Sequence, residues 1–203
     1  MHAPNFYDVM FLGAVLVGAL SSRKGLAVEL LPLGRWLVIV LAGAAAYEPV
    51  ARFMIGFTDI TFTTAAVWTY IALASGVAMV FHGLNPPLRR SMESCTLFGR
   101  GDQPLGMLAG GVKALAMIVA CMAVLNVGAA SESQLRTTAR FQREAFGKLA
   151  IPTVGTVHQG AIQRSRFGAW VNEHADFLLI QPDALPSESR SIIERRNPFD
   201  DLF

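Results

Sequence analysis

Three charged side chains lie inside long apolar stretches of this 203-residue chain, where they could pair with one another or line a polar path. Lys113 is the only charge in the run 105–128, which otherwise consists mainly of Gly, Ala, Met, Val and Leu. Glu29 and Arg35 lie in a second apolar stretch, 26–47. A charge at the centre of a bilayer costs about 3 kcal/mol on insertion scales. Such groups therefore usually face protein or a polar cavity, or reach toward the headgroups.

Glu29 is the best acidic partner for these two basic residues. If the stretches that hold Glu29 and Lys113 enter the membrane from the same side, a rise of about 1.5 Å per residue separates the two by about 7–8 Å in depth. A lysine side chain can largely cover that difference. Six residues separate Glu29 from Arg35, so these two point to different faces of their helix. An ion pair between helices, a proton or ion path, and a Lys113 that reaches the headgroups without a partner are the three interpretations.

The potentially reactive residues form no catalytic pattern. Cys95, Cys121, His82 and His158 make neither a nucleophile–base set nor the spacing of a metal site. We therefore expect a protein that is not an enzyme, with no catalytic residues, no metal site and no cofactor. A net charge of +2 is too small to indicate binding to nucleic acid.

The composition places these residues in a membrane protein. Hydrophobic residues make up 53% of the chain and charged residues 16%, against about 25% in soluble domains, and the mean hydropathy is +0.43. A bilayer core of about 30 Å needs about 20 helical residues. We therefore predict an all-α, multi-pass helix bundle with four spans, in the stretches 6–21, 26–47, 60–88 and 105–128. Three spans, with residues 26–35 at the interface, are the alternative.

A charge-dense tail begins near residue 128. Residues 129–203 hold 9 of the 17 Lys and Arg and 9 of the 15 Asp and Glu. We predict a transmembrane domain at 1–128 and a helical, partly flexible C-terminal tail at 129–203. Two stripes at helical spacing mark its helices: Leu135, Ala139, Gln142, Phe146 and Leu149, then Phe167, Trp170, Val171, His174 and Leu178.

Two features of the tail leave alternatives open. The first helix is amphipathic and either lies on an anionic lipid surface or packs on the membrane domain. The closing residues, NPFDDLF, are either a short docking peptide or an untethered terminus.

Small residues follow Asp102 at four-residue spacing. Gly106, Gly110 and Ala114 share one face of the last predicted span, where they leave a groove that the backbone of another helix can approach. We predict that Asp102 and these three residues form a helix-packing motif.

The first predicted turn adds a second motif. Its residues Lys24 and Gly25, followed by Glu29, match the Arg-Gly pair with an acid soon after that opens the second helix in one family of bacterial inner-membrane proteins. This part of the chain resembles the colicin V production protein (CvpA) family.

The last span extends the resemblance. In that family it typically begins with an aspartate followed by glycines at four-residue spacing, which Asp102, Gly106 and Gly110 match. Lys113 stands in place of an arginine, and Ala114 in place of a further glycine. The resemblance covers about residues 5–128 and does not include the tail.

This resemblance implies a membrane protein tied to the production or export of a secreted toxin peptide and to the cell envelope, without a catalytic signature. We expect a non-enzymatic accessory factor of the bacterial inner membrane that sits in the lipid bilayer and acts with a membrane-protein partner or as a homo-oligomer. A small channel or transporter subunit, with a path lined by Glu29, Arg35 and Lys113, is the alternative. Basic residues in the first and third loops favour the cytoplasm for those loops, which would place both chain ends outside it.

Overall fold

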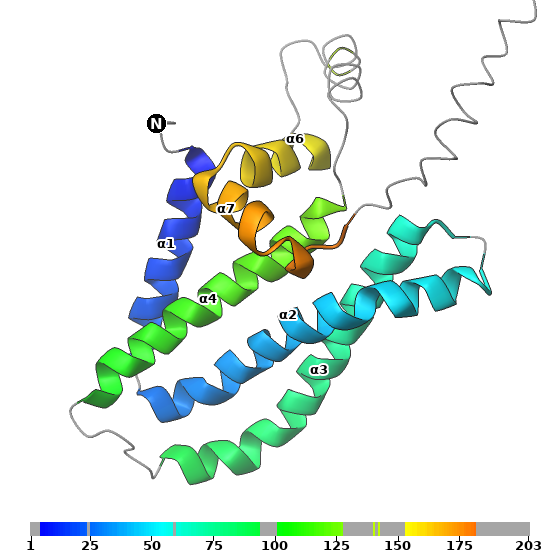
Figure 1. Cartoon of the computed structure of the whole chain (residues 1–203). Coiled ribbons are helices and arrows are strands. Elements are labelled where there is room, and N and C mark those ends of the chain that lie inside the picture. The colour runs from blue at the N-terminus through cyan, green and yellow to red at the C-terminus, as the bar shows by residue number, and fades with distance from the viewer. Residues whose placement is uncertain are drawn as a thin grey trace, which may run out of the picture.

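The structure, a computed structural model, describes residues 5–23, 25–58, 60–93, 101–127, 140, 142 and 153–181. Helices account for nearly all of these residues and no strand occurs among them (Figure 1), so the predicted all-α helix bundle is confirmed. The long helices are α1 (Phe6–Ser21), α2 (Leu26–Ile55), α3 (Phe62–Glu93) and α4 (Asp102–Asn126). The short ones are α6 (Val154–His158), the π-helix η2 (Gln159–Gln163), α7 (Arg166–His174) and the 3-10 helix η3 (Asp176–Leu178).

Three helices are long and apolar enough to cross a membrane, namely α2, the Phe62–Asn85 part of α3, and α4. The helix α1 is apolar but has only 16 residues, a length of about 24 Å against a core of about 30 Å. The helix α2 runs without a break through Pro32 and Pro49, so residues 26–35 continue directly into its apolar part. The fourth span therefore remains a prediction, and it concerns α1.

Helices that follow one another in sequence are not always neighbours in the bundle. Both α1 and α2 pack on α4, and α3 packs on α2, which gives the order α1, α4, α2, α3 (Figure 1). Small side chains make these close approaches possible. Ala65, Ala66 and Ala123 are fully buried, and the ring of Tyr70 lies on Gly43, where a side chain would collide with it.

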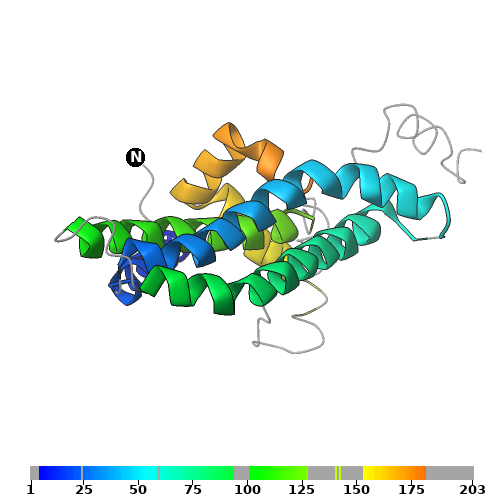
Figure 2. The same ribbon diagram turned by 90° about the horizontal axis from the view of Figure 1, so that it is seen from below.

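The end of α2 and the start of α3 form a hairpin that extends past the other helices (Figures 1 and 2). Glu48 and Arg52, one turn apart near the end of α2, form an ion pair of 3.0 Å in which both side chains are more than half exposed. Phe53 and Phe57 follow, with ring centroids 4.8 Å apart. The charged residues of α2 thus occur near both of its ends as well as within it.

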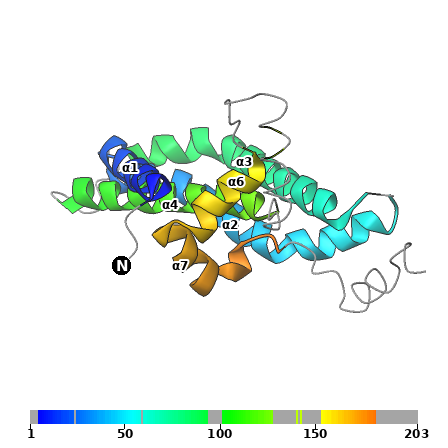
Figure 3. The same ribbon diagram turned by 90° about the horizontal axis from the view of Figure 1, so that it is seen from above.

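The described part of the tail lies across the ends of α1 and α4 (Figure 3). Phe167 packs against Phe11 of α1 with ring centroids 5.6 Å apart, and Val171 is buried. Trp170 and His174 of the same stripe are exposed and stack on each other with ring centroids 5.3 Å apart. The first predicted tail helix lies outside the described residues except for positions 140 and 142, and NPFDDLF lies wholly outside them.

Candidate functional site

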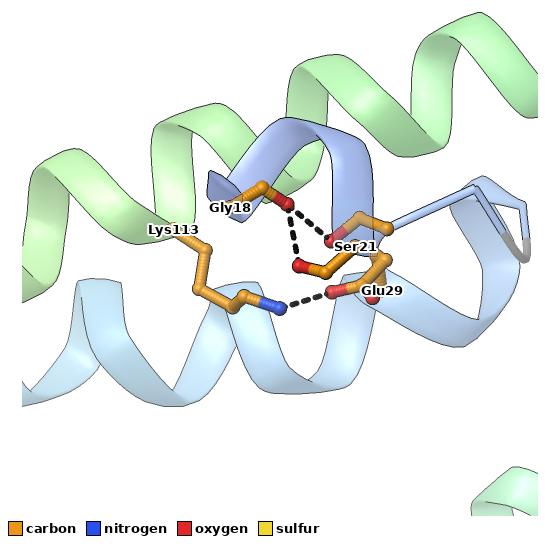
Figure 4. A network of polar contacts seen from close by, with 5 residues as sticks. Gly18, Ser21, Glu29 and Lys113 are labelled. Atoms are coloured by element: carbon orange, nitrogen blue, oxygen red, sulfur yellow. Dashed lines mark hydrogen bonds and ion pairs between the residues drawn. The ribbon is translucent and has the colours of Figure 1, made fainter. Parts of the chain in front are cut away.

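Lys113 of α4 and Glu29 of α2 form an ion pair across the interface of their helices. Lys113 Nζ donates a hydrogen bond to Glu29 Oε2 at 2.6 Å, and the side chains are 20% and 11% exposed. Figure 4 shows the two side chains pointing toward one another beside Gly18 and Ser21, at the end of α1. The predicted contact between Lys113 and Glu29 is confirmed.

Helix geometry explains why these two residues meet although Lys113 lies deeper in its helix. Side chains in an α-helix lean toward the N-terminus of the helix, so the ammonium group of Lys113 reaches back toward the start of α4. Glu29 lies in the first turn of α2, where the partial positive charge of the helix N-terminus favours an acid. The pair therefore links two adjacent spans and leaves neither charge alone.

Arg35 does not join this pair. Lys113 lines a cavity between α1 and α4, whereas Arg35 lines two cavities on the side of α3. No ion pair joins Arg35 to another described residue, and its buried Nε has no hydrogen-bond partner. The structure thus brings together two of the three intramembrane charges predicted from the sequence.

The motif that begins at Asp102 holds the turn between α1 and α2. Asp102 Oδ1 accepts a hydrogen bond from the backbone N–H of Leu26 at 3.2 Å, at the start of α2. Gly25, just before, has φ +109°, a conformation that favours glycine, and a side chain there would collide with the Asp102 carboxylate. Asp102 therefore replaces the side-chain cap that α2 lacks.

The glycines of the same motif let α1 approach α4. A Cβ atom on Gly106 would lie 2.8 Å from the carbonyl oxygen of Ser22, and one on Gly110 would collide with Ser22 and with the carbonyl oxygen of Gly18. Ala114 lies against Gly18 one turn later. All four predicted motif residues thus contact the end of α1 or the turn after it, which is the packing role expected of them.

Sequence reasoning missed two groups of polar contacts that attach the tail to the bundle, and the first lies at the start of α1. Asp8 accepts hydrogen bonds from the backbone N–H groups of Asn5, at 2.9 Å, and Phe167, at 3.2 Å, and so links the start of α1 to α7. The Asn5 side chain donates to the carbonyl oxygen of Gly160 at 3.1 Å. The only signal in the sequence was the Asn5–Asp8 spacing of a capping box, which is local and does not identify the tail.

The second group of missed contacts surrounds the buried side chain of Asn126, at the end of α4. Asn126 donates from Nδ2 to the carbonyl oxygen of Ile180 at 3.0 Å, and its Oδ1 lies 3.1 Å from Nε2 of His158. Because Asn126 accepts through Oδ1, Nε2 of His158 is the donor. Burial lowers the pKa of His158 below its ordinary value of 6.5. A neutral histidine thus helps to fasten the tail to α4.

Metal ligands are not gathered at any of these places. Within the described ranges, no group of three or more His, Cys, Asp or Glu residues is arranged to hold a metal ion. Asp8 and Asp102 each accept a hydrogen bond from a backbone N–H group of another element of the fold, and Glu29 binds Lys113 of another helix.

These features define a class of protein: an all-α membrane helix bundle whose spans are linked by an ion pair and by close glycine contacts. The chain belongs to the colicin V production protein family, whose model matches residues 7–175. The match continues past residue 128 and includes α6 and α7, so the expectation that the family resemblance excludes the tail is wrong. No curated protein and no solved structure was found to match.

Proposed function

We propose that this protein is a non-enzymatic, multi-pass protein of the bacterial inner membrane that assists the production or secretion of a peptide toxin and the maintenance of the envelope. The observation that carries the proposal is the family match over residues 7–175, which includes both the membrane helices and the tail that packs on them. The membrane-protein class is a finding, whereas the accessory role is our proposal.

The contacts that the polar residues make support a structural role for this protein. Glu29 is paired with Lys113, and Asp102 and Asp8 accept backbone hydrogen bonds that join separate helices. A lysine held by a carboxylate favours a structural role for this pair over a polar path for ions. We accordingly place the accessory role before a channel or transporter subunit.

The packing of α1 supports a fourth span. The first residues of α1 lie at the tail, through Asn5 and Asp8, while its last residues lie at the start of α4, through Gly18. The helix therefore runs antiparallel to α4 across most of the same layer, and a local thinning of the bilayer would accommodate its shorter length. Four spans place both chain ends on the same side, whereas three place them on opposite sides. Reporter fusions at each end distinguish the two topologies.

Deletion of the gene tests the accessory role. In a bacterium that carries this gene and makes colicin V, we expect deletion to reduce the growth-inhibition zone on a sensitive lawn, and the intact gene to restore it. Assays of toxin inside and outside the cells separate a defect in production from one in secretion. Zones of unchanged size in the deletion strain would contradict the proposed role.

Fractionation tests the location and the partners. We expect the protein to stay in the membrane fraction after alkaline carbonate washing and to follow inner-membrane markers in a density gradient. We also propose a membrane-protein partner or a second copy of the chain, and no nucleic acid. Cross-linking in cells, followed by mass determination after extraction, distinguishes a homo-oligomer from a complex with another protein. Recovery of the protein at its monomer mass alone would count against both.

A further inference from the structure

Arg35 is a cation within a spanning helix for which the described part of the chain supplies no acid. Its guanidinium lies 5.7 Å from the ring centroid of Trp36, a cation–π contact that offsets part of the cost of its charge. Its Nε is nevertheless buried without a hydrogen-bond partner. Because an unpaired charge in the hydrocarbon region is costly, the position of Arg35 calls for an anionic partner from outside these residues.

Two cavities of different character meet at Arg35. The smaller, of about 180 Å³, is lined by Leu31, Pro32, Phe81 and Asn85 together with Arg35. The larger, of about 570 Å³, lies between α2, α3 and α4 and is mainly apolar. Its walls include Trp36 of α2, Ala74 of α3 and Val124 of α4. Arg35 therefore lies between the smaller cavity, which has polar groups in its wall, and the larger, mainly apolar cavity, which we call the slot.

We propose that Arg35 and the slot bind one long-chain fatty acid, with its carboxylate on the guanidinium and its alkyl chain in the slot. Arginine holds carboxylates through two parallel hydrogen bonds, and Arg35 lines both the slot and the smaller cavity. The slot follows α3 from Ala78 to Tyr70, a length of about 12 Å, so it takes the part of an extended alkyl chain next to the carboxylate rather than a compact solute.

The depth of the site favours a fatty acid over a phospholipid. Arg35 lies nine residues into α2, about 13 Å from its start, well below the headgroups if α2 spans the bilayer. A phospholipid would have to bring its phosphate and ester groups to that depth, whereas a fatty acid brings only a carboxylate. At about 30 Å³ per water molecule, the smaller cavity holds a carboxylate and a few waters. This proposal does not depend on the accessory role proposed above.

Fluorescence quenching tests the site directly. The protein is placed in nanodiscs of zwitterionic phosphatidylcholine, with Trp68→Phe and Trp170→Phe so that Trp36 alone reports. Stearic acid with a spin label on its chain should quench Trp36 in a saturable way, and its methyl ester should not. We expect Arg35→Gln to weaken binding at least tenfold. Arg52→Gln, at an exposed arginine of the same helix, should leave it unchanged.

A matched pair in α3 tests the slot independently of the charge. Ala74→Phe fills the slot and should weaken binding at least tenfold, while Ala72→Phe, which faces a separate groove, should not. The pair keeps the proposal testable even where Arg35→Gln fails to fold. Equal affinity for acid and ester, or unchanged binding in folded Arg35→Gln or Ala74→Phe, would overturn it. Displacement of the label by phosphatidylglycerol at lower mole fractions than by oleate would assign the site to a phospholipid and overturn the fatty acid.

Discussion

Asp102 at the start of α4 accepts a hydrogen bond from the backbone N–H of Leu26 at the start of α2, over a sequence separation of 76 residues. The bond satisfies one of the N–H groups that a helix leaves free at its N-terminus. It also fixes the turn at Gly25, whose missing side chain makes room for the carboxylate. The first turn with Gly25 and the motif that begins at Asp102, which carry the family resemblance in this sequence, therefore contact each other directly.

We predict that Asp102→Ala lowers the free energy of unfolding by about 1 kcal/mol, as the loss of a helix cap does. Thermal unfolding in detergent measures the change. Asp102→Asn retains an oxygen that can accept from Leu26, so it should lose less stability than Asp102→Ala. Equal losses in the two variants would show that the cap is not what Asp102 contributes.

Gly110 should not tolerate even a methyl group. We expect Gly110→Ala to destabilise the bundle by about 1–3 kcal/mol, because its Cβ collides with Ser22 and with the backbone of Gly18. Gly13→Ala is the matched control, since nothing lies within 4 Å of a Cβ at Gly13 and alanine favours a helix. By the same reasoning, Gly110→Leu should cost more than Leu115→Ala. A Gly110→Ala protein as stable as Gly13→Ala would argue against the close approach of α1 and α4.

The ion pair of Lys113 and Glu29 should appear as coupling in a double-mutant cycle. Lys113→Met leaves Glu29 without its partner, so the single variant should be less stable than the double variant with Glu29→Gln. We expect a coupling energy on the order of 1 kcal/mol, in the usual range for residues in contact. Chemical or thermal unfolding of all four proteins in one detergent gives the value, and strictly additive effects would mean that the contact adds no stability.

The attachment of the tail should weaken at acidic pH. Because burial lowers the pKa of His158 below 6.5, the unfolded chain binds a proton over a pH range in which the folded chain does not. The stability that neutral His158 contributes is thus present above pH 6.5 and is lost as the pH falls toward the pKa of the folded state.

Melting temperatures at pH 8 and pH 5.5 measure this effect. We expect the decrease between the two to be smaller in His158→Gln than in the unaltered protein. His174→Gln, at an exposed position of α7, should keep the full decrease. If His158→Gln retains it as well, another group is responsible for the pH dependence.

The sequence determined the features that depend on local pattern and helix geometry. The apolar runs set the helices, because a span must satisfy its backbone internally and present apolar side chains to lipid. The pairing of Lys113 with Glu29 could be predicted because the helical rise per residue is fixed, so the depth of each residue in the membrane can be estimated. Glu29 was the acid closest in depth to Lys113. The different faces of Glu29 and Arg35 followed from the helical repeat.

Only the tertiary structure decided which faces meet. The cap on Leu26 comes from Asp102 in another helix, and no local pattern links the two positions. The tail binds through Asp8 and Asn126, and no sequence pattern pairs these two residues with Phe167 and His158. Trp170 and His174 share the stripe of Val171 and lie in the same helix α7, yet they are exposed while Val171 is buried. Helical periodicity fixes which residues share a face, but the packing of whole helices selects the surface against which that face is buried.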